Sequence, residues 1–211
     1  MFFDRPESGE VAILVHISIA SESEREDPTE FEELALSAGA MPVAYITGSR
    51  KKPTPDYFIG VGKLEEIAAA VQAHQAELVL FNHALSPSQE RNLEAQLKCR
   101  VLDRTGLILD IFARRAQTKE AKLQVNLARM EWSLPRLKRA WTHLGRQGGR
   151  GGATRGEGEQ QIEVDRRIVR KRISQMREEL TQVRKHRATQ RKERGRTPVP
   201  NAAIVGYTNA G

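Results

Sequence analysis

The stretch GRQGGRGGATRGEGEQ, residues 145–160, separates two apolar stripes of the sequence. Apolar residues recur at steps of four and three from Leu123 to Leu144, and again from Val169 to Val183, with Ile162 seven residues before Val169. This spacing lines apolar side chains along one side of a helix. The glycine-rich stretch has no aliphatic side chain larger than that of Ala153, so it cannot form a core of its own. The pattern predicts an antiparallel helical hairpin with residues 145–160 at its tip.

The two stripes match in length, since each spans 22 residues. The upstream stripe comprises Leu123, Leu127, Met130, Leu134, Leu137, Trp141 and Leu144, and the downstream stripe comprises Ile162, Val169, Ile173, Met176, Leu180 and Val183. Pro135 lies within the upstream stripe and is expected to kink or restart that helix, with Ser133 available as a cap. Trp141 is interpreted as a core residue in preference to a base-stacking one.

Before the hairpin, short apolar runs alternate with segments of helical periodicity. The runs are residues 11–20, 41–47, 78–81 and 100–103, and helix starts are indicated at Asp27-Pro28, Gly60 to Lys63, Ser86 to Gln89 and Asp103. This alternation predicts an α/β domain with a mainly parallel sheet. We therefore divide the chain into an α/β domain at 1–116, the hairpin at 117–195, and a linker followed by the start of a third domain at 196–211.

Charge is distributed unevenly along the chain. Residues 1–105 contain 10 Lys and Arg against 17 Asp and Glu, whereas residues 106–211 contain 24 against 10. A basic second half that includes a glycine-arginine loop indicates a polyanionic partner, foremost a nucleic acid. The alternative is that the basic residues only face solvent and bind no partner. An anionic membrane fits less well, because the stripes are narrow seams suited to a partner helix.

Several classes of protein are disfavoured by the sequence. Cys99 is the only cysteine, which excludes an internal disulfide. The start of the sequence lacks the features of a signal peptide, and its longest apolar run, residues 11–20, is too short to span a membrane. We therefore expect a soluble, cytoplasmic protein.

No catalytic constellation and no metal site are predicted. Asp103, Arg104 and Asp110 follow the last apolar run, and we interpret them as a helix cap and a solvated pair. The histidines are too scattered to form a metal site, and His16 is expected to be a satisfied core histidine. The Gly60-Val-Gly62 segment is better explained by a turn that requires positive φ than by a bound phosphate.

The basic residues of the hairpin are the candidate RNA-binding site. They are Arg146, Gly148, Gly149, Arg150, Arg155 and Gly156 in the tip, and Arg166 and Arg167 at the start of the second helix. Arginines release counterions when they contact phosphates, and glycines allow close approach of the backbone. We expect contact with a phosphate backbone, at an affinity that falls steeply with salt, and no base-specific recognition.

The last residues contain part of a phosphate-binding motif. Ala202 to Val205 has the pattern of a buried strand. The six residues after it are the first six positions of G-x-x-x-x-G-K-[ST], whose backbone N–H groups cradle nucleotide phosphates. They are Gly206, Tyr207, Thr208, Asn209, Ala210 and Gly211.

Long segments of the sequence resemble the HflX-type ribosome-associated GTPases. They are ITGSRKKPTPDYFIGVGK at 46–63, LFNHALSPSQERNLE at 80–94, RVLDRTGLILDIFARRAQTKEAKLQV at 100–125, WTHLGRQGGRGG to RGEGEQQIEVDRR within 141–167, and NAAIVGYTNAG at 201–211. The resemblance implies an N-terminal α/β domain, a helical hairpin and a GTPase domain. It also implies GTP hydrolysis with Mg²⁺, binding of a monomer to RNA of the large ribosomal subunit, and separation of stalled ribosomes.

Two departures from the family pattern affect function. The loop is two residues longer than the family's usual form, and Glu157 replaces the usual proline. The P-loop lysine and Ser/Thr are absent after Gly211, so residues 1–211 alone are expected neither to hydrolyse GTP nor to bind it tightly. Two other functions remain open: a stand-alone RNA-binding protein without enzymatic activity, and a coiled-coil adaptor that binds protein.

Overall fold

A four-stranded parallel sheet forms the centre of the N-terminal part. The computed structural model describes residues 9–20, 28–137 and 155–194, with side chains described only from 163 to 192 in the last range. The strands are β1 (Val11–Ile19), β2 (Met41–Arg50), β3 (Leu78–Phe81) and β4 (Arg100–Asp103), in the order β2-β1-β3-β4. The predicted α/β class and parallel sheet are confirmed.

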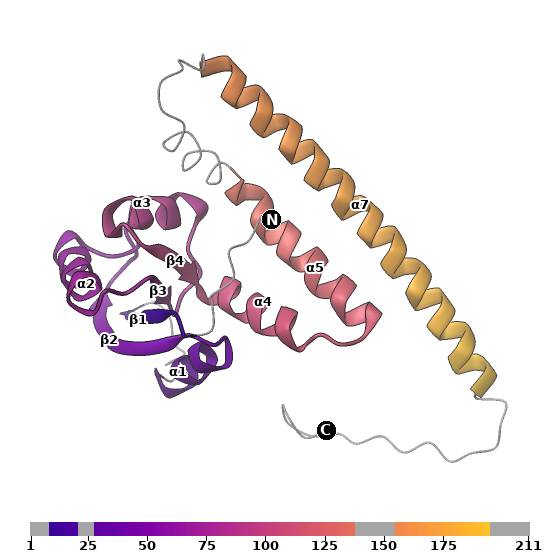
Figure 1. The fold of residues 1–211 in the computed structure, drawn as a ribbon, viewed down its shortest axis with the longest axis horizontal. Coiled ribbons are helices and arrows are strands. Elements are labelled where there is room, and N and C mark those ends of the chain that lie inside the picture. Colours follow the sequence, from indigo (N-terminus) through magenta and orange to yellow (C-terminus); the bar gives the residue numbers. More distant parts are fainter. Residues whose placement is uncertain (1–8, 21–27, 138–154, 195–211) are drawn as a thin grey trace.

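Helices cover both faces of this sheet (Figure 1). They are α1 (Pro28–Ser37), α2 (Val61–His74), α3 (Pro87–Leu97) and α4 (Arg104–Arg115). Successive residues of β1 point to opposite faces. Ile13 and Val15 therefore join the core beneath α2 and α3, whereas Ala12 and Leu14 join the core beneath α1 and α4.

The helix starts follow the local sequence, with one exception. Ser86 and Gln89 form a reciprocal capping box at α3, and the Asp103 carboxylate accepts a hydrogen bond from the N–H of Gly106 at 2.7 Å. The predicted positive φ at Gly60 is wrong, since its φ is −83° and the positive φ (66°) belongs to Phe58. Gly60 instead provides clearance, because a Cβ there would lie 2.9 Å from Nη1 of Arg50.

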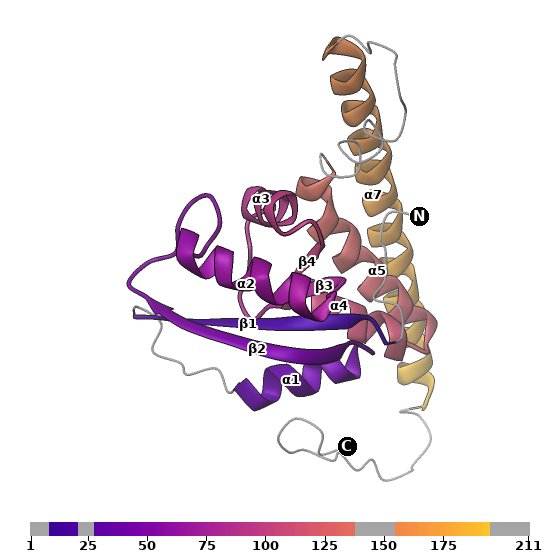
Figure 2. The same cartoon turned by 60° about the vertical axis from the view of Figure 1, so that its left-hand side comes forward.

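The described part of the hairpin consists of α5 (Lys119–Ser133), a 3₁₀ turn η1 (Leu134–Arg136) and α7 (Arg155–Arg194). Pro135 lies in η1, so the predicted interruption of the first helix is confirmed. Figures 1 and 2 show α7 running antiparallel to α5, with α5 between α7 and the α/β domain. The basic helix is therefore the outermost layer of the molecule.

The predicted tip requires a correction at its C-terminal end. Residues 155–160 form the first turns of α7, which contains 40 residues. Gly156 and Gly158 each cost a helix about 1 kcal/mol relative to alanine, but Glu157, Glu159 and Gln160 favour helix, and the apolar stripe downstream packs the helix in place. Helix α7 is therefore longer than α5, which contains 15 residues. Residues 145–154 lie outside the described part of the chain.

Candidate nucleic-acid interface

The two predicted stripes pack against each other along the hairpin. Leu137, Val169 and Ile173 form a buried cluster against Leu127, Met130 and Leu134. Two ion pairs join α7 to α5, Arg177 to Glu131 and Arg187 to Glu120, each at 2.6 Å. Both partners of the first pair are exposed, so it contributes little stability. Its position is consistent with the alignment of the two helices given by their apolar contacts.

The outer side of α7 presents a dense array of positive charge. Residues 163–192 include eleven Lys and Arg and four Asp and Glu, and ten of the eleven basic residues are exposed. Among the described residues, seven of the ten have no carboxylate partner: Arg167, Lys171, Arg172, Arg184, Lys185, Arg191 and Lys192. Unpaired, exposed cations are available to phosphate groups without first losing an ion pair.

The predicted RNA-binding residues fall into three groups. Arg167 is exposed, whereas Arg166 is half-buried with Nη1 3.8 Å from a carboxylate oxygen of Glu163. Arg155 and Gly156 lie in the first turn of α7. The remaining tip residues and all of the partial P-loop lie outside the described residues: Arg146, Gly148, Gly149 and Arg150, and Gly206, Tyr207, Thr208, Asn209, Ala210 and Gly211.

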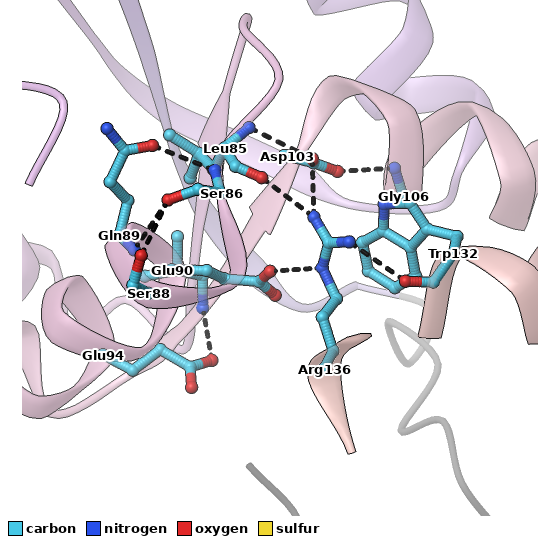
Figure 3. Close-up of polar contacts among 11 residues, drawn as sticks. Leu85, Ser86, Ser88, Gln89, Glu90, Glu94, Asp103, Gly106, Trp132 and Arg136 are labelled. Carbon is cyan, nitrogen blue, oxygen red and sulfur yellow. Dashed lines mark hydrogen bonds and ion pairs between the residues drawn. The ribbon is translucent and has the colours of Figure 1, made fainter. Parts of the chain in front are cut away.

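A buried joint connects the hairpin to the α/β domain (Figure 3). Nε of Arg136 donates to Glu90 at 2.7 Å, and Nη2 donates to Asp103 at 3.2 Å and to the Leu85 carbonyl at 2.9 Å. The guanidinium carbon also lies 3.9 Å from the ring centroid of Trp132. We define the joint as Arg129, Trp132 and Arg136 of the hairpin with Glu90, Asp103 and Asp110 of the domain.

Two carboxylates of the joint differ from the sequence-based interpretation. Asp103 is a helix cap, as predicted, but it is 1% exposed, and burial raises the pKa of its carboxyl against the opposing effects of Gly106, Arg136 and Leu85. Asp110 was expected to be solvated, which is wrong. It is 8% exposed and pairs with the equally buried Arg129 at 2.9 Å. The partners lie in different helices, so no local spacing indicates the pair.

A second polar cluster lies at the carboxyl ends of the strands. The ring of His83 accepts a hydrogen bond from the N–H of Ile17 at 3.0 Å and stacks on His16 with centroids 5.2 Å apart. Burial, followed by the neighbouring His16 and Arg104, lowers the pKa of His83 to about 4. His16 lies 3.2 Å from the Asn82 amide, which confirms that it is hydrogen-bonded, but it is half-buried and not part of the core as expected.

Neither a metal site nor a membrane span occurs within the described ranges. No group of three His, Cys, Asp or Glu side chains is arranged there to hold a metal ion. Among the same residues, none of the helices combines the length and the apolar character needed to cross a bilayer.

Two family models match consecutive parts of the chain. The model described as "GTP-binding GTPase N-terminal" matches residues 25–113, and the one described as "GTP-binding GTPase Middle Region" matches residues 115–194. Structures of SsGBP with GDP and of a GTP-binding protein from Sulfolobus solfataricus with GDP superimpose with TM-scores of 0.60 and 0.56. Each is 24% identical, and they cover 84% and 82% of this chain and 45% of their own chains, which shows a shared fold.

Curated relatives are much more similar in sequence. GTPase HflX of Escherichia coli K12 is 56% identical over 209 residues, which is 99% of this chain and 49% of the relative. GTPase HflX of Caldanaerobacter subterraneus is 48% identical over 202 residues, 96% of this chain and 47% of the relative. The chain thus spans about half the length of these relatives. With consecutive family models along it and this identity over nearly all of its residues, the chain belongs to the HflX family of GTPases.

Proposed function

We propose that this chain is the ribosome-binding part of a GTP-hydrolysing factor that associates with the large (50S) ribosomal subunit and separates stalled ribosomes. The observation that carries the proposal is the exposed, unpaired positive charge along α7. That helix is held away from the domain by α5, so a nucleic acid can approach it along its length (Figure 2). Ribosomal RNA supplies a matching density of phosphates.

We propose that α7 recognises the phosphate charges and the groove shape of the RNA, and not its base sequence. The cations lie on a regular helix, and an RNA duplex offers side chains a shallow minor groove with phosphates on either side. The tip residues Arg146, Gly148, Gly149, Arg150, Arg155 and Gly156, with Arg166 and Arg167 beyond them, are proposed to make the remaining contacts. The monomer is the proposed binding unit, since the outer face of α7 needs no second chain to be complete.

The nucleotide chemistry is proposed to depend on more than this chain. Residues 196–211 would begin the GTPase domain of the longer relatives, after the α/β domain (1–116) and the hairpin (117–195). GTP and Mg²⁺ would bind where the lysine and hydroxyl of a complete P-loop follow Gly211. The chain alone is proposed not to hydrolyse GTP. The relatives are named GTPases and the two similar structures are described as complexes with GDP, which supports a nucleotide-binding domain in the longer proteins.

Cosedimentation with large ribosomal subunits at two salt concentrations tests the proposal. The variant Arg167→Ala/Lys171→Ala/Lys185→Ala removes three exposed charges while keeping good helix formers. Each lost phosphate contact should lower the slope of log affinity against log salt by about 1. The control Lys51→Ala/Lys52→Ala/Arg91→Ala removes equal charge from exposed positions of the α/β domain and should bind nearly as the parent does.

Two outcomes would contradict the proposal. Equal losses in the α7 variant and in the control would show that the net charge, and not α7, determines binding. Binding that does not change with salt would instead indicate a protein partner, as expected of a coiled-coil adaptor. The contribution of the tip is measured separately with Arg150→Ala/Arg155→Ala, which should weaken binding without altering the thermal unfolding of the domain.

A further inference from the structure

Helix α5, together with the turn η1 that follows it, makes contacts on two sides. One carries the apolar residues that pack on α7. The other carries Arg129, Trp132 and Arg136, spaced three and then four residues apart, and these contact the α/β domain. Residues with this spacing share one side of a helix. Among the described residues, the ion pairs between the hairpin and the domain therefore come from one row of side chains on α5 and η1.

The two arginines of this row bind different elements of the domain. Arg129 pairs with Asp110 in α4, and Arg136 pairs with Glu90 in α3 and with Asp103 at the end of β4. Seven residues separate the arginines, which is about 10 Å along a helix. A single attachment point would leave the helix free to pivot. Two points at this separation fix the direction of its axis.

Arg136 is suited to fix a direction. Its guanidinium donates to four oxygens: those of Glu90 and Asp103 and the carbonyls of Leu85 and Trp132. Such a planar fork accepts partners only in defined directions, whereas apolar contacts are non-directional. Glu90 and Asp103 have side chains 1% exposed, so water does not compete for them. Buried ion pairs of this kind are weak evidence of stability but can specify one geometry.

Trp132 and Gly106 bring the two helices close together between the arginines. A Cβ at Gly106 would lie 3.0 Å from a ring carbon of Trp132 and 2.6 Å from Cδ1 of Leu102. The glycine thus leaves the space that the indole ring occupies. With the ring in this space, both arginines reach their carboxylates at once.

We infer that Arg136 is the positioning residue of the hairpin: through Glu90 and Asp103 it fixes the angle at which the hairpin leaves the α/β domain. Arg129 and Asp110 supply the second point of attachment. The inference goes beyond the proposed function, because it concerns the direction of α7 and not what α7 binds. Without the Arg136 contacts, the hairpin pivots about the remaining pair while α5 and α7 stay packed together.

The experiment measures the distance between two spin labels by pulsed electron resonance in the whole chain. The labels replace exposed Gln72 in α2 and exposed Gln182 in α7, in a Cys99→Ser background. The parent should give one narrow distance, and Arg136→Met should lose it in favour of a broad distribution. Arg177→Met is the matched control, since it removes an arginine–carboxylate pair within the hairpin and should keep the narrow distance.

A third variant separates direction from stability. Arg136→Met/Glu90→Met/Asp103→Asn removes the two buried carboxylate charges together with Arg136 and keeps a capping side chain at residue 103, so thermal stability should rise above that of Arg136→Met. Its distance distribution should remain broad, because the directional hydrogen bonds are absent. A narrow distance in this variant, or in folded Arg136→Met, overturns the inference. No RNA enters the measurement, so its failure is distinct from failure of the proposed function.

Discussion

Lowering the pH should weaken the fold through His83. Its Nε2 accepts the N–H of Ile17 at 3.0 Å, so the ring must be neutral at that nitrogen. The residue is 8% exposed, and its neighbours include Phe58 at 4.9 Å between ring centroids as well as the nearby His16 and Arg104. Protonation would place a charge in this enclosed position and remove the acceptor of a backbone hydrogen bond.

The magnitude follows from the pKa values of the folded and unfolded states. Folding lowers the pKa of His83 from 6.5 to about 4. Between these values the unfolded chain binds more protons than the folded one, so stability is full above 6.5 and decreases as the pH falls towards 4. At about 1.4 kcal/mol per pKa unit, the total is about 3 kcal/mol, of which about 2 kcal/mol is lost by pH 5.

Urea unfolding, followed by circular dichroism between pH 8 and pH 4.5, measures this effect. The variant His83→Gln keeps an oxygen acceptor for Ile17 but cannot be protonated. It should be less stable than the parent at pH 8, and the difference should shrink by about 2 kcal/mol at pH 5. Asp103 and the other carboxyl groups titrate in both proteins, so their contributions cancel. Parallel stability curves for the two proteins would show that His83 does not cause the loss of stability at low pH.

Three further changes probe other parts of the fold. Arg129→Met leaves Asp110 charged and buried, so urea unfolding should show a loss of about 3–5 kcal/mol, and Arg129→Met/Asp110→Leu should recover most of it; equal losses in both would argue against a charge effect. Ser86→Ala removes half of a capping box and should lower thermal stability by about 1 kcal/mol; an unchanged melting temperature would contradict it. Burial, then Glu94, raises the pKa of Cys99 to about 12, so a thiol reagent at pH 8 should react only after urea is added; fast reaction of the folded chain would exclude this.

Local features were predicted from the sequence where neighbours along the chain decide the conformation. The capping box at Ser86, the break at Pro135 and the two packed stripes all depend on residues within one or two helical turns. The same kind of reasoning was wrong at residues 155–160. Glycine signals a loop only when nothing holds it in a helix, and here a long helix continues downstream.

The α/β class, the hairpin and the concentration of positive charge in its second helix all follow from patterns in the sequence. How these parts are joined depends on the three-dimensional packing. Arg136 contacts Glu90 and Asp103, which are 46 and 33 residues away, and Arg129 contacts Asp110 in another helix. Such pairs have no periodic signature, because burial and distance are set by the packing of whole elements. A buried charge is stable only with its partner, so the joint formed where the fold brought these side chains together.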